Sequence, residues 1–127
     1  MGFKFGKRSQ VKLEGVHPDL VRVMELAISR SSLDFAITEG IRTLEKQKEY
    51  LKTGASTTLR SRHLTGHTVD VALFRGKELR WDWPLYGKLA SIVKIAAVDL
   101  QIPIEWGGDW KKFPDGPHFQ LPWKDYP

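Results

Sequence analysis

The chain contains no cysteine among its 127 residues. This absence excludes disulfide bonds, thiolate zinc sites and cysteine nucleophiles, so any metal would have to bind His, Asp or Glu side chains. The sequence also lacks an apolar run long enough to span a membrane, and no apolar signal-peptide core follows the basic residues Lys4, Lys7 and Arg8. We therefore expect a protein without a membrane span that is synthesised in the cytoplasm without a signal peptide.

Clusters of basic residues are missing as well. The 20 Lys and Arg residues exceed the 15 Asp and Glu residues and give a net charge of +5, but they are spread along the chain instead of lining one helix. No nucleic-acid-binding motif accompanies them, so nucleic acid is not an expected partner. The positive charge favours association with a polyanion, such as a cell wall or an anionic lipid surface, without selecting one.

Internal repeats and low-complexity tracts are absent, and 127 residues is the length of one ordinary domain. Hydrophobic residues make up 41% of the chain, which is enough to close a core. We therefore expect a single domain over residues 1–127, with no separate cell-wall-binding module, that folds alone as a monomer.

Hydrophobic periodicity predicts helices and strands in loose alternation. Pro18 suits the first turn of one helix, Thr43 can cap another, and Gly54 can end it in a left-handed conformation. The predicted helices cover residues 18–30, 43–54 and 82–97, the predicted strands cover residues 33–38, 69–73, 102–106 and 118–121, and a polar loop covers residues 55–62. This order predicts an α+β fold in which a small antiparallel sheet is flanked by helices.

Three residues are candidate metal ligands: His63, Asp70 and His118. A catalytic zinc site uses three protein ligands of this nitrogen and oxygen kind and leaves a fourth position open. Seven residues separate His63 from Asp70, which would put them on opposite faces of one continuous strand, but Thr65-Gly66 offers a break between them. The sequence therefore predicts His63 on a loop that faces Asp70.

Asp115 lies three residues before His118, and the turn signal Gly116-Pro117 separates them. Such a turn would bring the Asp115 carboxylate near the metal without making it a ligand. This is the position required of a group that takes a proton from the attacking water. The residues alone therefore favour a hydrolase.

Structural explanations exist for the other conspicuous side chains. His67 follows His63 by four residues, but Gly66 and two β-branched residues argue against a helix there, so we interpret it as a structural or supporting residue. Arg42 could be a solvated charge and Gln47 part of a helix face. The aromatic residues Trp106, Trp110 and Trp123 are more typical of a core or a cleft wall than of a sugar platform, and His17 is typical of a helix entry.

Two segments resemble the LAS metallopeptidases, a family named for lysostaphin, the D-Ala-D-Ala metallopeptidases and sonic hedgehog: SRHLTGHTVDVA, and WGGDW followed by DGPHFQL. The resemblance is strongest to the phage L-alanyl-D-glutamate endopeptidases. It extends over almost the whole chain, from FKFGKRSQ and LEGVHPDLVRV through EGIRTLEKQKEYL to PHFQLPW.

The resemblance implies roles for seven residues. It implies one zinc ion per chain bound by His63, Asp70 and His118, with Asp115 as the catalytic base. The substrate-binding residues that it implies are Arg42, Gln47 and Ser61. One departure is Thr68, where the family pattern leads us to expect Ala. The segment between Asp70 and Trp106 also looks short, which would alter the rim of the cleft.

The function implied by the resemblance is that of a zinc-dependent endolysin that hydrolyses the L-Ala–D-Glu bond of peptidoglycan stem peptides. Such an enzyme would act on the cell wall after its release from the host cytoplasm. A D-Ala-D-Ala carboxypeptidase or dipeptidase would use the same zinc site and remains open as an alternative. A non-catalytic, zinc-containing cell-wall-binding module is a third possibility, against which the intact Asp115 argues.

Overall fold

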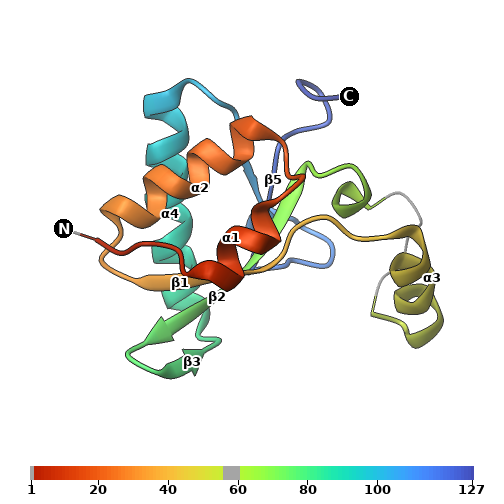
Figure 1. Cartoon of the computed structure of the whole chain (residues 1–127), viewed down its shortest axis with the longest axis horizontal. Coiled ribbons are helices and arrows are strands. Elements are labelled where there is room, and N and C mark those ends of the chain that lie inside the picture. The colour runs from red at the N-terminus through yellow and green to blue at the C-terminus, as the bar shows by residue number, and fades with distance from the viewer. Residues whose placement is uncertain (1, 56–60) are drawn as a thin grey trace.

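The computed structural model describes residues 2–55 and 61–127. Its elements, in chain order, are α1 (Lys7–Leu13), α2 (Pro18–Arg30), β1 (Asp34–Glu39), α3 (Leu44–Thr53), the 3-10 helix η1 (Arg62–Leu64), β2 (Thr68–Arg75), β3 (Glu78–Arg80), α4 (Trp83–Leu100), β4 (Glu105–Trp106), the 3-10 helix η2 (Gly107–Asp109) and β5 (His118–Gln120). The predicted α+β fold with a small antiparallel sheet is confirmed (Figure 1).

The sheet is built around β2. Strand β1 pairs along one edge of β2, while β5 and β3 pair with the first and last parts of its other edge, and β4 pairs with β5. These four pairings are all antiparallel. Central strand β2 therefore contacts strands from both ends of the chain, and the site described below lies where β2 and β5 meet.

One face of the sheet is the core face. Alternate residues of β2 and β5, including Val69, Val71 and Phe119, are fully buried there. Helices α2 and α4, which pack against each other, contribute the apolar residues of the same core (Figure 1). Because strand side chains alternate between faces, Asp70 and His118 lie on the opposite face. The core therefore anchors the strands whose other face carries the polar residues.

Local signals explain the ends of the helices. Pro18 begins α2, and the side chain of His17 accepts a hydrogen bond from the backbone N–H of Asp19, as expected for a helix entry. Thr43 caps α3 by accepting from the backbone N–H of Lys46. Gly54 follows α3 with φ 80°, in the left-handed region. Figure 1 shows α3 at one side of the molecule, apart from α1, α2 and α4.

The predicted elements differ from the structure in several places. Helix α1, strand β3 and the 3-10 helices η1 and η2 were not predicted, and the predicted strand 102–106 is reduced to the two residues of β4. The 3-10 helix η1 begins at residue 62, the last residue of the predicted loop. Pro103 lacks a backbone donor, which accounts for the late start of β4. Residues 56–60 of the predicted polar loop lie outside the described residues. No helix in the described ranges is both long and apolar enough to cross a bilayer.

Candidate metal centre and active site

Strands β2 and β5 place two candidate ligands side by side. Asp70 and His118 are direct partners in the antiparallel register, so their side chains lie on the same face of the sheet. Oδ1 of Asp70 lies 3.1 Å from Nδ1 of His118. The alternation of apolar and polar residues in these strands thus produces a polar face on which the two side chains meet.

His63 reaches the same place from η1. Gly66 follows it with φ 77°, a left-handed conformation that supplies the predicted break before β2. The Nε2 atom of His63 lies 3.3 Å from Oδ2 of Asp70. Its Nδ1 atom lies 2.8 Å from the carbonyl oxygen of Gly40, which can only accept, so Nδ1 carries the proton and the Nε2 lone pair is free to face Asp70.

The three side chains form a donor set suited to a metal ion. One ligand atom from each of His63, Asp70 and His118 lies within 4.8 Å of the other two. Two imidazole nitrogens and one carboxylate oxygen are the donors of a three-ligand catalytic zinc site. Both histidines are almost fully buried, and Asp70 is 25% exposed, so the group opens to solvent on one side. The residues present therefore fit a metal ion.

The charges of Asp70 and His118 shift each other's pKa. Burial alone would raise the pKa of Asp70, but His118 and His63, which donate hydrogen bonds to Asp70 when they are protonated, outweigh burial and hold that pKa well below its usual range. Burial would lower the pKa of His118, yet in the protonated form the hydrogen bond from Nδ1 to Asp70 and the charge of Asp70 raise that pKa above the ordinary value. Asp70 is therefore a carboxylate over the whole physiological pH range.

Asp115 stands beside this group on the predicted turn. The backbone N–H of His118 donates to the carbonyl oxygen of Asp115 at 3.2 Å, which closes the turn, and Oδ2 of Asp115 lies 3.9 Å from Nδ1 of His118. A Cβ atom at Gly107 would lie 2.4 Å from that Asp115 carbonyl oxygen, so only glycine allows the close approach. Asp115 is 47% exposed, and burial followed by the charge of Asp70 raises its pKa.

Arg42 is held by a carboxylate and an amide. Its Nε and Nη2 atoms donate to the two carboxylate oxygens of Glu39, and Nη1 donates to Oε1 of Gln47 at 2.6 Å. The guanidinium carbon lies 4.6 Å from the centroid of the Tyr50 ring. Nη1 also faces Oγ of Ser61 at 3.5 Å. The predicted substrate-binding residues Arg42, Gln47 and Ser61 are therefore neighbours, although Gln47 is fully buried and Ser61 also caps η1.

Glu39 is one polar residue of this region that the sequence did not point to; Glu105 and Gln120 are others. A β-bulge between Ile37 and Glu39 shifts the register, so that Glu39 and not Thr38 lies opposite Asp70. Oε1 of Glu39 then lies 3.7 Å from Nε2 of His63. Simple alternation along the strand would have placed Thr38 there, and a bulge leaves no clear mark in the sequence of this strand.

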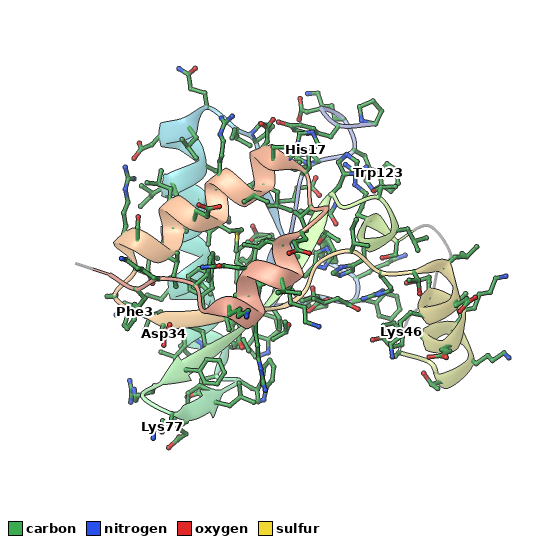
Figure 2. All side chains as sticks on the ribbon, viewed as in Figure 1. Phe3, His17, Asp34, Lys46, Lys77 and Trp123 are labelled. Carbon is green, nitrogen blue, oxygen red and sulfur yellow. The ribbon has the colours of Figure 1, made fainter. Side chains whose placement is uncertain are left out.

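A cavity of about 830 Å³ connects these groups. The three candidate metal ligands line this cavity, and so do Asp115, Arg42 and Ser61. Trp110 and Trp123 line its walls, as predicted, whereas Trp106 packs against Trp83 and donates from Nε1 to the carbonyl oxygen of Gly116. Figure 2 shows Trp123 on the side of the molecule that faces α3, remote from Lys77 at the outer end of the β2–β3 hairpin.

His67 lies outside this group, in agreement with its predicted supporting role. Its ring is 5.5 Å from that of His17 and 6.4 Å from that of Tyr126. The backbone carbonyl of His67 accepts from the N–H of Leu121, which joins the segment after η1 to the segment after β5. His67 and His17 therefore help to hold the chain around the site without lining it.

Comparison with known proteins identifies relatives of most of the chain. Residues 1–121 match the family model described as phage L-alanyl-D-glutamate peptidase. The chain is 32% identical over 114 residues to the L-alanyl-D-glutamate peptidase of Escherichia phage T5, with 87% of this chain and 83% of the relative covered. It is 39% identical over 96 residues to the L-alanyl-D-glutamate peptidase of Listeria phage A118, which covers 76% of this chain but only 33% of that relative.

Solved structures agree with the fold. The crystal structure of Serratia marcescens L-Ala D-Glu endopeptidase ChiX matches with a TM-score of 0.93 at 48% identity, covering 99% of this chain and 95% of that chain. The vancomycin-resistance D,D-dipeptidase VanXYg matches with a TM-score of 0.54 at 22% identity, covering 84% of this chain and 50% of that chain. At that identity the second likeness concerns the fold alone.

Proposed function

Because the chain belongs to the phage L-alanyl-D-glutamate peptidase family, we propose that it is a zinc-dependent endopeptidase that hydrolyses the L-Ala–D-Glu bond of peptidoglycan stem peptides. The observation that carries the proposal is the placement of a metal-binding donor set, a partly exposed carboxylate and an arginine around one cavity. That combination is what metal-assisted hydrolysis of a peptide bond requires.

His63, Asp70 and His118 would hold one zinc ion per chain. The donor nitrogens would be Nε2 of His63 and Nδ1 of His118, because these are the atoms that face Asp70. A zinc ion bound there would supply Lewis acidity, which polarises a carbonyl group and makes a water molecule a better nucleophile at neutral pH. The donor set fits zinc through its nitrogen and oxygen ligands and its opening toward the cavity.

Asp115 would move the proton during the reaction. Its carboxylate is half exposed in the cavity and lies close to the candidate ligand His118 without belonging to the donor set. It would accept a proton from the attacking water and return it to the leaving amine. The raised pKa of Asp115, caused first by burial and then by the charge of Asp70, makes the carboxylate a better proton acceptor than an exposed one.

Arg42 would orient the substrate. Its guanidinium group has five N–H donors, of which Glu39 and Gln47 engage three at hydrogen-bonding distance. Because Glu39 balances its charge, Arg42 acts less as a free charge than as a fixed hydrogen-bond donor for carbonyl or carboxylate oxygens of the substrate. Ser61, beside Arg42 at the cavity, is a further candidate contact.

Peptidoglycan is the proposed macromolecular substrate, and the cell wall the proposed site of action. The substrate carries carboxylates along its stem peptides, which suits a chain with a net charge of +5. A D-Ala-D-Ala carboxypeptidase would use the same donor set, so the identity of the cleaved bond separates the two functions.

Solubilisation of purified cell walls tests whether the chain is a hydrolase. The parent protein, incubated with purified peptidoglycan, is expected to lower the turbidity of the suspension and to release soluble fragments with new amino groups. An Asp115→Asn variant with bound zinc is expected to do so far more slowly. Peptidoglycan that sediments with the parent protein but stays intact would instead support a non-catalytic binding module.

A further inference from the structure

A row of polar side chains lies directly behind His118 on the polar face of the sheet. Thr68 of β2, Gln120 of β5 and Glu105 of β4 are partners in register across the three strands. Oε1 of Gln120 lies 2.8 Å and Oγ1 of Thr68 lies 2.9 Å from Nε2 of His118. Nε2 of His118, the nitrogen that faces away from Asp70, therefore has two polar neighbours.

The hydrogen atoms in this row can be assigned from its ends. The hydroxyl of Thr68 has one proton, which it donates to the carbonyl oxygen of Phe119 at 2.7 Å, so it can only accept from His118. The amide Nε2 of Gln120 donates to Oε1 of Glu105 at 3.0 Å. A carboxylate can only accept, so Glu105 turns the amide nitrogen of Gln120 toward itself and the amide oxygen toward His118.

Both neighbours of Nε2 are therefore acceptors, and the proton of a neutral His118 belongs on Nε2. Its lone pair then lies on Nδ1, which faces Asp70 at 3.1 Å. A metal ion needs that lone pair, since a protonated nitrogen cannot bind it. In the opposite tautomer the proton would lie on Nδ1. Nε2 would then have no hydrogen to donate to Gln120 and Thr68, and the protonated Nδ1 could not bind a metal ion.

We propose that Glu105, acting through Gln120 and assisted by Thr68, fixes the tautomer of His118 in which Nδ1 binds the metal. Glu105 and Gln120 are positioning residues, because they act on the metal through His118. Thr68 stands where the family pattern leads us to expect Ala, so its hydroxyl adds a second acceptor that an Ala could not provide. The inference rests on the metal site proposed above, but not on which bond the enzyme cuts.

Three substitutions test the contributions of Glu105, Gln120 and Thr68 one at a time. Glu105→Gln keeps the size of the side chain but frees the Gln120 amide to rotate. Gln120→Leu removes the acceptor, and Thr68→Ala removes only the second acceptor. Substituting residues that support a metal ligand typically weakens metal binding by ~10–100-fold. We expect a loss in this range for Gln120→Leu, a loss near its lower end for Glu105→Gln, and the smallest loss for Thr68→Ala.

The experiment measures zinc affinity by competition with a chelator and the imidazole protons of the zinc-loaded protein by ¹⁵N NMR. The parent is expected to show a slowly exchanging Nε2–H signal from His118, which weakens or broadens in Glu105→Gln and Gln120→Leu. Glu25→Gln makes the same chemical change on an exposed part of α2 and is expected to alter neither measurement. Both readouts are independent of peptidoglycan hydrolysis.

A double variant distinguishes an effect of hydrogen-bond direction between residues 105 and 120 from an effect of side-chain packing alone. Glu105→Gln combined with Gln120→Glu exchanges the carboxylate and the amide, so the amide again donates across the strands and the carboxylate accepts from His118. Zinc affinity and the Nε2–H signal should recover most of what Glu105→Gln loses. Unchanged zinc affinity and an unchanged signal in both Glu105→Gln and Gln120→Leu would overturn the inference, as would a double variant no better than Glu105→Gln.

Discussion

Asp70 and His118 face each other directly across β2 and β5, with Oδ1 of Asp70 3.1 Å from Nδ1 of His118. The other oxygen of Asp70 faces Nε2 of His63 at 3.3 Å. One carboxylate thus faces two imidazoles brought together from different parts of the chain. Because neither histidine is close to the other in sequence, the geometry of the donor set depends on the pairing of these two strands.

His118→Ala is expected to abolish stoichiometric zinc binding, because it removes one of three proposed ligands. Elemental analysis of the parent, purified without added metal, should give one zinc per chain, and the variant should give much less. His17→Ala offers a control of the same chemical kind outside the donor set. Full zinc occupancy in His118→Ala would contradict the assignment.

Asp115→Asn is expected to keep zinc and the fold while losing ~10²–10⁴-fold in turnover on peptidoglycan, the usual contribution of general acid–base catalysis. Asparagine has nearly the same shape but cannot accept the proton. Asp109→Asn is a matched control, because Asp109 lies six residues before Asp115 and is an exposed ion-pair partner of Lys94. Parent-like turnover of Asp115→Asn with zinc still bound would show that another group moves the proton.

Arg42→Lys is expected to lower kcat/KM by ~10–100-fold, since hydrogen bonds to charged groups contribute about 1.5–3 kcal/mol and lysine cannot reproduce the planar fork. The variant also loses the paired contact with Glu39. Steady-state kinetics on a soluble muropeptide, with Arg22→Lys as the control on exposed α2, would measure the effect. Kinetics equal to the parent would remove Arg42 from the substrate site.

His67→Gln is expected to make the stability of the protein less sensitive to acid. Burial, followed by the charges of Arg62 and His17, lowers the pKa of His67 in the folded protein. Below about pH 6.5, the usual pKa of histidine, the unfolded chain therefore takes up a proton more readily than the folded chain, and the free energy of unfolding falls.

Thermal unfolding at several pH values tests this expectation. The variant should have the lower Tm at pH 7.5, because it loses the ring contacts with His17 and Tyr126. The difference from the parent should narrow as the pH falls to 5. Parallel curves for the two proteins over this range would show that His67 does not contribute to the acid sensitivity.

Much of the fold was predictable because its signals are local. Pro18, Thr43 and Gly54 mark the ends of helices through backbone chemistry that acts within a few residues. The alternation in β2 and β5 assigned opposite faces to Asp70 and to its apolar neighbours. Helix α1 was missed, because it is short; its Ser9 accepts a hydrogen bond from the N–H of Ile37 on edge strand β1, a contact that no local pattern encodes.

The grouping of the three candidate ligands could be predicted from the sequence, but the residues that contact them from neighbouring strands could not. Gly66 and the Gly116-Pro117 turn indicated how His63 and Asp115 could approach the other residues. The position of Glu39 opposite Asp70 results from a bulge, and the contact of Glu105 with Gln120 results from the register between β4 and β5, neither of which can be read from the sequence. Gln120 could have been noticed, because it lies two residues after His118 and therefore on the same face of a strand.

The most direct test of the proposed function is mass spectrometry of a purified disaccharide-tetrapeptide muropeptide after digestion. We expect a disaccharide that retains only L-Ala, together with a tripeptide that begins with D-Glu and ends with D-Ala. The Asp115→Asn variant, measured in parallel, should give both products far more slowly. Release of D-Ala or, from a pentapeptide substrate, of D-Ala-D-Ala, with the L-Ala–D-Glu bond left intact, would contradict the proposed endopeptidase function and favour a carboxypeptidase or dipeptidase.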